Sequence, residues 1–533
     1  MMNSIKAPSF FRPTSRPSSP APLAATPRPD APERTPRPLT KLSSLSNFRR
    51  PSPAPTPPSP IAPAPLVQDG SYLETLALKL SEAVSKALAQ STGPSVINDM
   101  VGGKRPIPSG RGRAFGALIA SELAATRENP HLNRAIIRSL LRPLSVLLSN
   151  LSAHLLPILT SPLFLSPPAP TVQAPTPNPT QLHALAISAF AGEVLEVFDD
   201  LALGLDADTR GDGLKAIREG LVSIVNRVVN PLVAGIRAEM MPLLEALEAP
   251  NSCNTTKIAS AAKNSPVQHQ SITALTSVIP VYARALSRYT ASRYSQAALA
   301  PFLISIIWRG LVALANRPYS PPSPPPSPVP ALLPTLALKK RRSASITPPL
   351  TPPSARFTIK LPPSRPPSPP GIPTPTSTAA DTRVLCELLG SLPRPNSDTE
   401  STRLANEAIE EAFDGLKALA PLLDAVQAAP SSQCTSEDEL EVLTEELPTL
   451  LALPVLLHAY GNKSGYSVAQ LLGLPEDGYR KGCLSGFGRA EECAGAVGQR
   501  VLDVLRREEG VPAIVLEWLE AEMADVAHGD GGN

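Results

Sequence analysis

The sequence predicts an all-α protein, built from irregular helical bundles that long Pro/Ser-rich disordered segments interrupt. Three observations support this fold class. The apolar content rests on Leu and Ala, with only 2 Trp, 8 Tyr and 11 Phe in 533 residues, which favours helices over sheets. Leucines recur at three- and four-residue spacing in many windows. The 66 prolines gather in a few stretches, which leaves roughly 390 residues for ordered structure.

Composition and charge divide the chain into four parts. These are a Pro/Ser/Arg-rich tail (1–66), a helical domain (67–317) with a Pro-rich loop at about 166–180, a basic Pro-rich linker (318–380) and an acidic helical region (381–528). The linker holds 21 prolines and 7 basic residues without one acidic residue, whereas residues 381–533 carry a net charge of −16. We expect the acidic region either to stand alone or to pack on residues 67–317 as one domain.

The tail of residues 1–66 contains candidate phosphorylation sites. Its Ser-Pro and Thr-Pro pairs, Ser19, Thr26 and Thr35 among them, suit proline-directed kinases. Ser15 lies in the sequence Arg-Pro-Thr-Ser-Arg-Pro, which fits the R-x-x-S-x-P pattern that 14-3-3 proteins read after phosphorylation. A tail rich in Pro, Ser and Arg also produces such matches by chance, and this alternative stays open.

Helical periodicity organises residues 67–317. With Pro231 and Pro242 breaking or bending the chain, it predicts helices over 71–92, 131–159, 181–205, 213–229, 232–247 and 272–316. The stretch 102–113 is rich in glycine and basic residues but lacks the Walker pattern, so we expect a solvated turn between helices. Arg134, Arg138 and Arg142 form a basic ridge along one of the predicted helices.

Two apolar stretches raise the question of a membrane span. Residues 143–165 contain no Asp, Glu, Lys or Arg, which meets the length of a spanning helix. Leucines and serines fall on different faces of this helix, however, and lipid does not favour a polar stripe. The apolar run 297–308 lies in an interval of only 15 residues between Arg293 and Arg309, which favours a buried helix. The sequence therefore predicts no transmembrane segment.

The linker contains a compact basic cluster, Lys339, Lys340, Arg341 and Arg342. Such a cluster in exposed chain suits the groove of an importin and predicts nuclear import. Ser343 and Ser345 suit basophilic kinases, and Thr347 and Thr351 suit proline-directed kinases. Ser368 fits the pattern that 14-3-3 proteins read after phosphorylation. A proline ligand for aromatic grooves is predicted on Lys360, Pro363 and Pro366.

The acidic region predicts further helices over 384–389, 401–426, 440–457, 490–508 and 511–523. The pattern Leu-x-x-Leu-Leu occurs twice, at 447–451 and 453–457, and is typical of either a coregulator-binding peptide or a buried helix. We expect burial, because leucine-rich core helices produce this pattern often. Ser436, which three acidic residues follow, fits a helix cap or an acidophilic kinase site, and we favour the cap.

No pattern of catalytic or metal-binding residues is visible. The six histidines are scattered, and no nucleotide-binding or hydrolase motif occurs. Five cysteines, odd in number and without CxxC spacing, indicate neither a disulfide framework nor a zinc site and suit a reducing compartment. No DNA-binding module is readable. We therefore expect a protein that is not an enzyme and needs no cofactor.

Together these features predict a non-enzymatic nuclear regulatory or adaptor protein with a cell-cycle, developmental or transcriptional role. Its helical surfaces would bind other proteins, and phosphorylation of the disordered Ser/Thr-Pro segments would control it. The expected partners are importin, proline-directed and basophilic kinases, and 14-3-3 proteins. The alternative is a cytoplasmic scaffold at membrane or cytoskeleton that uses its basic tails as contacts.

Overall fold

The structure is a computed structural model. It describes residues 70–90, 100–101, 103–166, 177–205, 213–250, 268–318, 377–428, 437–460, 467–508 and 513–529. Of these residues 80% are helical and none forms a β-strand, which confirms the predicted all-α fold. The described helices belong to one compact unit, residues Asp69–Asn533.

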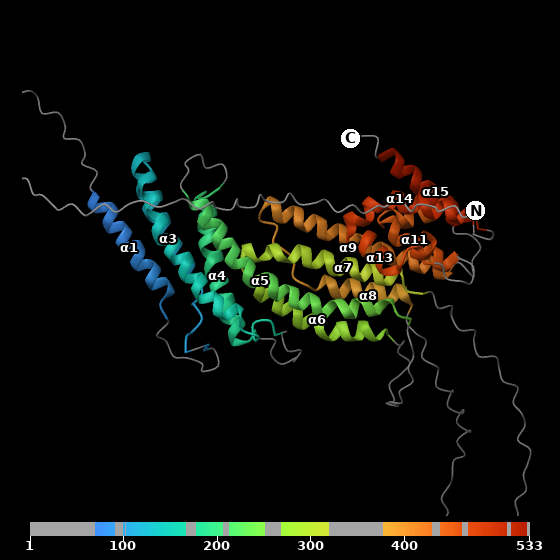
Figure 1. Cartoon of the computed structure of the whole chain (residues 1–533), viewed down its shortest axis with the longest axis horizontal. Helices are drawn as coiled ribbons and strands as arrows, with labels where there is room; N and C mark the ends of the chain where they lie inside the picture. Colours follow the sequence, from blue (N-terminus) through green and yellow to red (C-terminus); the bar gives the residue numbers. More distant parts are fainter. Residues whose placement is uncertain are drawn as a thin grey trace, which may run out of the picture. The chain divides into compact units, whose positions relative to one another are not determined.

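Four helices form the first part of this unit, namely α1 (Gly70–Leu88), α2 (Arg111–Ala125), α3 (Pro130–Leu159) and α4 (Pro179–Asp200). The residues before α3 and α4, Asn129 and Asn178, cap these helices with their side chains, and a proline takes the first helical position. α1 packs on α3 (Figure 1), and α2 packs on α4. α2 begins at Arg111, so the turn expected over 102–113 is shorter than predicted.

Helix α5 (Leu214–Glu245) runs through both of its prolines, Pro231 and Pro242, before a 3₁₀ turn, η2 (Ala246–Glu248). The two helices predicted over 213–229 and 232–247 are therefore one helix. A proline removes one backbone hydrogen bond and crowds the preceding turn. Buried side chains on both sides of Pro231, such as Val229 and Leu232, hold the helix against its neighbours. α5 contacts α3, α4, α6 and α7.

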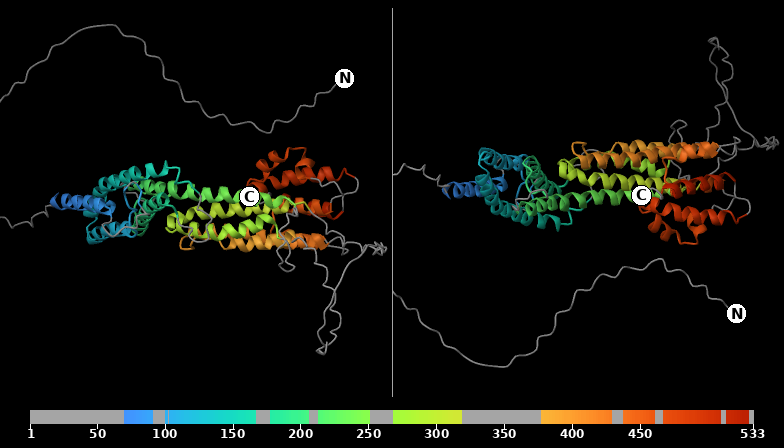
Figure 2. Two further views of the ribbon diagram at one scale, coloured as in Figure 1. Left: turned by 90° about the horizontal axis from the view of Figure 1, so that it is seen from below. Right: turned by 90° about the horizontal axis from the view of Figure 1, so that it is seen from above.

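Helix α7 (Leu299–Ala315) lies inside the core. Its neighbours include η3 (Arg293–Ala298), α8 (Thr378–Gly390) and α9 (Glu400–Ala428), whereas α6 (Gln270–Tyr289) packs on α5 and α8. Most residues of α7 are buried, as expected, and α7 lies between α5 and α9 (Figure 2). Residues before and after the 319–376 connection therefore share one hydrophobic core.

Six further helices complete the described part of the chain, α10 (Glu437–Thr444), α11 (Thr449–Tyr460), α12 (Val468–Leu472), α13 (Glu476–Cys483), α14 (Phe487–Leu505) and α15 (Ala513–Gly529). α11 contacts α7, α9, α14 and α15, and every residue from Thr449 to Leu457 is buried. Both Leu-x-x-Leu-Leu patterns thus belong to the core, as expected, because surrounding helices cover α11 on all faces.

Within the described residues, three helices are long and apolar enough to cross a membrane by length and composition. They are Pro179–Asp200, Leu214–Glu248 and Arg293–Ala315. In their most apolar windows 67%, 44% and 67% of the residues are buried inside the protein. Packing against neighbouring helices accounts for much of this apolar composition.

Candidate functional site

All of the site residues that the sequence predicted lie outside the described residues. They are the import cluster Lys339–Arg342, the phosphorylation candidates Ser15, Ser19, Thr26, Thr35, Ser343, Ser345, Thr347, Thr351 and Ser368, and the proline-ligand residues Lys360, Pro363 and Pro366. Ser436 also lies outside them. The site that the structure describes is formed by other residues.

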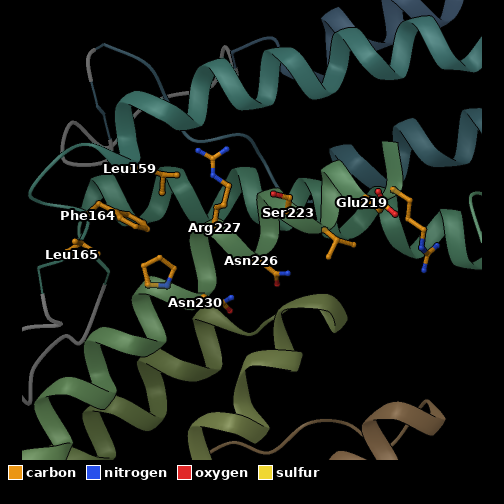
Figure 3. Close-up of a pocket in the computed structure, with 11 residues that line it drawn as sticks. Leu159, Phe164, Leu165, Glu219, Ser223, Asn226, Arg227 and Asn230 are labelled. Carbon is orange, nitrogen blue, oxygen red and sulfur yellow. The ribbon is translucent and has the colours of Figure 1, made fainter. Parts of the chain in front are cut away.

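A groove of about 700 Å³ lies between the end of α3 and α5 (Figure 3). Its apolar lining comes from Leu159 on α3, from Phe164 and Leu165 in the turn that follows, and from Val222 and Pro231 on α5. Phe164 is buried, whereas Leu165 is 60% exposed. The groove thus combines a packed base with an apolar side chain that faces solvent.

The turn that carries Phe164 and Leu165 is fixed by the start of α4. The Asn178 side chain donates a hydrogen bond to the Leu163 carbonyl at 2.7 Å. The Gln181 side chain donates to the Phe164 carbonyl at 3.0 Å. The same two residues form the capping box of α4. The apolar end of the groove is therefore preformed, because the cap of one helix also holds the turn after another.

The other wall of the groove is one face of α5. It presents polar side chains at helical spacing, namely Glu219, Ser223, Asn226, Arg227 and Asn230. Arg227 is exposed and forms no ion pair with any residue that the structure describes. Together with Arg218, the described lining carries two cations and one carboxylate. Arg218 is paired with Asp199, so Arg227 is the lining cation that an acidic group of an occupant can approach.

Arg218 belongs both to the groove lining and to a polar network with α4 and η3. Its Nη2 lies 2.5 Å from Asp199 Oδ1 and donates to the Tyr294 hydroxyl at 2.7 Å. Burial and the hydrogen bond to Asp199 raise the pKa of Tyr294, so the phenol stays protonated. Arg218 Nη1 is buried and has no hydrogen-bond partner among the described residues. The guanidinium is thus held in place by Asp199 and Tyr294, and its Nη1 is covered by the protein.

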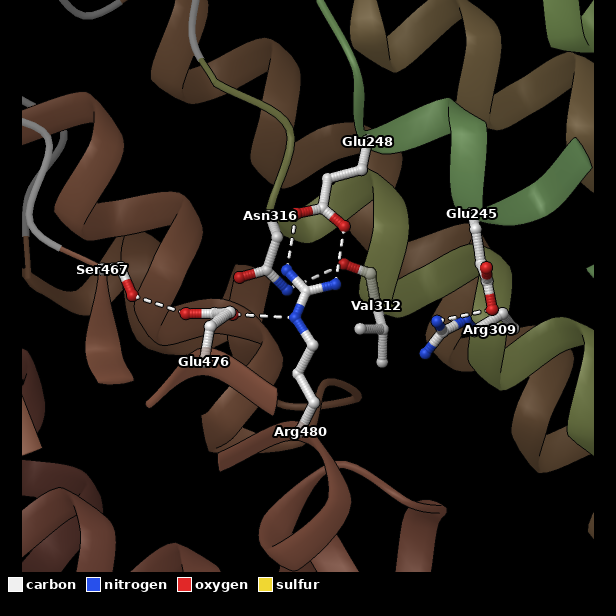
Figure 4. A network of polar contacts seen from close by, with 8 residues as sticks. All are labelled: Glu245, Glu248, Arg309, Val312, Asn316, Ser467, Glu476 and Arg480. Atoms are coloured by element: carbon white, nitrogen blue, oxygen red, sulfur yellow. Dashed lines mark hydrogen bonds and ion pairs between the residues drawn. The ribbon is translucent and has the colours of Figure 1, made fainter. Parts of the chain in front are cut away.

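A second polar cluster joins α13 to the 3₁₀ turn after α5 (Figure 4). The Arg480 guanidinium donates to both Glu248 oxygens, at 2.7 and 2.5 Å, and to Glu476 at 2.8 Å. The Ser467 hydroxyl donates to Glu476 at 2.9 Å. The hydrogen bonds to Glu248 and Glu476 raise the pKa of Arg480. A bidentate pair fixes orientation as well as distance, so this cluster positions α13.

A buried ion pair joins the two sides of the 319–376 connection. Arg317 follows α7, Asp381 lies in the first turn of α8, and Arg317 Nη1 is 2.7 Å from Asp381 Oδ2. The side chains are only 4% and 1% exposed. Arg317 Nε also donates to the Leu247 carbonyl at 2.5 Å. Burial lowers the pKa of Arg317, and Asp381 opposes this effect. The end of α7 and the start of α8 are thus held together.

The remaining clusters of titratable groups offer less for ligand chemistry. A groove of about 690 Å³ on α9 is lined by several carboxylates, but Glu410 is paired with Arg394 and Glu407 with Arg403. Within the described residues, no three His, Cys, Asp or Glu side chains are placed to hold a metal ion. The groove between α3 and α5 is therefore the candidate site on which we base the function.

Comparison with known proteins provides no relative for this chain. No protein-family model matches it, and neither a curated protein nor a solved structure does so.

Proposed function

We propose that this chain is a non-enzymatic regulatory adaptor of the nucleus that binds other proteins through its helical surfaces. Phosphorylation of the Pro-rich segments controls it. The observation that carries this proposal is the groove between α3 and α5, which combines an apolar lining, a preformed turn and two arginines. These are the properties of a peptide-binding surface rather than of a reaction centre.

The occupant that fits this groove is an acidic amphipathic helix of a partner protein. Its apolar face packs on Phe164, Leu165 and Val222, as in other helix-in-groove complexes. Arg218 and Arg227 are nine residues apart on α5, about 14 Å along its axis. Nine residues are two and a half turns, so the two arginines leave α5 on opposite sides, and Arg227 is the one that a carboxylate of the partner helix pairs with.

The groove is tested by charge reversal at its rim. Proteins that co-purify with the tagged full-length chain are quantified for the wild type, for Arg227→Glu and for Arg237→Glu. Arg237 is exposed on the same helix outside the groove, so this control makes the same change of charge. We expect Arg227→Glu, but not Arg237→Glu, to lower the recovery of partners that bear an acidic helix by about tenfold or more.

Binding of a synthetic peptide with the sequence of such a partner helix is then measured in solution. The wild type and Arg237→Glu should bind it, whereas Arg227→Glu should bind it at least about tenfold more weakly. Reversal of one acidic residue of the peptide should restore binding to Arg227→Glu. If all three proteins recover the same partners and bind the peptide equally, the groove is not the docking site.

Nuclear import is tested separately on the basic cluster. Replacement of Lys339, Lys340, Arg341 and Arg342 by Ala in the tagged full-length chain should move it from the nucleus to the cytoplasm. Aspartate at Ser343 and Ser345 should weaken import, since each phosphate that it imitates adds about −1.5 to −2 charge beside four cations. A chain that stays nuclear after the alanine replacements contradicts the import step and leaves the groove unaffected.

One observation favours the alternative of a cytoplasmic scaffold at a membrane. Arg134, Arg138 and Arg142 are all exposed along α3, so the predicted basic ridge lies on the surface. Sedimentation with vesicles of anionic phospholipid at physiological salt separates the two functions. The adaptor predicts no binding. Binding that disappears when the three arginines are replaced by Ala would favour the scaffold.

A further inference from the structure

Two cysteine thiols meet where the chain passes from α13 to α14. Cys483 is the last residue of α13, and Cys493 lies ten residues later on α14. Gly482, the residue before Cys483, marks the place where the two cysteines approach each other. Cys493 Sγ lies 3.8 Å from the carbonyl oxygen of Gly482. Both cysteines are half-buried, so a small reagent can reach them.

The turn that brings the thiols together is anchored from both sides. The Gly482 carbonyl accepts a hydrogen bond from Arg489 Nε at 2.7 Å. The Leu484 carbonyl accepts one from the Trp308 indole of α7 at 2.8 Å. The Trp308 ring packs against Phe487, the first residue of α14, with ring centroids 4.5 Å apart. The contact between the thiols is therefore set by the core of the protein.

A buried phenol without a hydrogen-bond partner lies beside the thiols. Tyr479 on α13 is 2% exposed, and its hydroxyl has no partner among the described residues. It interacts electrostatically with both Cys483 and Cys493, as does Arg489. A buried hydroxyl without a partner is costly. Burial raises the pKa of Tyr479, so the phenol stays protonated.

We propose that Cys483 and Cys493 form a reversible intramolecular disulfide, with a low-molecular-weight disulfide such as glutathione disulfide as the oxidant. One cysteine thiolate attacks glutathione disulfide, forms a mixed disulfide and releases a glutathione thiolate, which takes up the proton that the cysteine lost. The second cysteine loses its proton, attacks the protein sulfur of the mixed disulfide and releases the second glutathione. The protein loses two electrons and two protons, and the two glutathione molecules gain them.

The surroundings of Cys483 favour the disulfide over the dithiol. Burial and the neighbouring Cys493 thiol raise the pKa of Cys483 to about 11, and these effects outweigh the nearby cation of Arg489. A disulfide is strongly oxidising when the dithiol that it yields is stabilised as a thiolate, and that stabilisation is lacking at Cys483. Exchange at neutral pH is slow, because the thiolate is the attacking species.

Oxidation acts on the contact between α13 and the rest of the helical unit. The disulfide ties the end of α13 to α14, and Arg480 lies one turn before Cys483 on α13. Arg480 in turn holds Glu248 through two hydrogen bonds. A fixed α13 keeps this pair aligned, so the oxidised protein is expected to unfold at a higher temperature than the reduced protein.

The test uses the purified full-length chain. Samples equilibrated with glutathione disulfide or with glutathione are alkylated, digested and mapped by mass spectrometry. After oxidation, Cys483 and Cys493 should lose alkylation together and appear in one disulfide-linked peptide, and glutathione should reverse this change. Cys386, a half-buried cysteine on α8, serves as the internal control and should remain alkylated.

The variant Cys483→Ser separates a true pair from two independent thiols. In this variant Cys493 should stop at the mixed disulfide with glutathione, because the resolving thiol is gone. Its thermal midpoint should no longer depend on the redox buffer. The proposal is overturned if both wild-type cysteines stay alkylated under oxidising conditions. It is also overturned if each carries its own glutathione, or if either pairs with Cys253 or Cys434.

Discussion

The buried pair Arg317–Asp381 permits a quantitative prediction about stability. Asp381→Ala removes a carboxylate that is 1% exposed and leaves the Arg317 guanidinium, which is 4% exposed, without its counterion. The hydrogen bond from Arg317 to the Leu247 carbonyl does not neutralise this charge. Removal of one partner from a buried ion pair costs about 3–5 kcal/mol, because the other charge stays in a medium that solvates it poorly.

An exposed pair on the neighbouring helices provides the matched control. Arg383 and Asp424 join α8 to α9, and their side chains are 55% and 44% exposed. Asp424→Ala makes the same chemical change in water, where an ion pair contributes about 0–1 kcal/mol. The two variants therefore share the substitution and differ in the solvation of the charge that remains.

Urea denaturation followed by circular dichroism measures the free energy of unfolding for both variants. Asp381→Ala should lose several times more than Asp424→Ala. The double variant Arg317→Met/Asp381→Leu should regain most of the loss, because it buries two apolar side chains instead of one lone charge. A loss for Asp381→Ala that does not exceed the loss for Asp424→Ala would refute the reasoning, since the buried charge would then be solvated by other means.

Three further predictions concern packing, pH and the linker. Gly116→Ala should destabilise the protein by about 1–3 kcal/mol, because the new Cβ would lie 2.4 Å from Val197. The control Gly235→Ala, whose new Cβ would meet no atom of a neighbouring element within 4 Å, should leave stability unchanged or raise it by up to about 1 kcal/mol. Equal urea midpoints for the two variants would contradict this prediction. Burial lowers the pKa of His458 from its ordinary value of 6.5, so the unfolded chain takes up the proton first and stability falls as the pH drops below 6.5. His458→Gln should lose less stability between about pH 7 and pH 5 than the wild type, and an unchanged pH profile would rule out this histidine as a cause. A protease site inserted into 319–376 and cut should leave two fragments that co-elute in gel filtration, because α7 and α9 share a core; separate elution in native buffer would show that the core does not hold them.

Sequence periodicity predicted the helices well where a single apolar face is repeated. The leucines of 131–159 and the apolar run of 297–308 correspond to α3 and α7. Prediction failed at Pro231, because a proline is a local signal for a break and the packing that carries α5 across it comes from other helices. It also missed most of α2, whose glycines read as a loop, although Gly112 and Gly116 permit the close approach of α4.

The candidate groove could not be predicted from local patterns. Ser223, Asn226 and Asn230 have the spacing of an ordinary solvated helix face, and that signal does not distinguish a surface from a groove wall. The apolar wall opposite comes from the turn at Phe164, whose position depends on hydrogen bonds from Gln181. The thiol pair could not be predicted either, because the spacing of Cys483 and Cys493 indicates neither a disulfide nor a metal site.

By itself the sequence determined the helical class of this protein, the Pro-rich stretches and the separation of charge along the chain. These properties follow from residue type and from spacing within one helix, which act over a few neighbours. The tertiary structure decided which faces meet. Arg317 and Asp381 are 64 residues apart and yet form a buried pair, and Trp308 reaches the Leu484 carbonyl 176 residues away. The physical reason is that burial and pairing depend on packing between distant helices, which no local pattern contains.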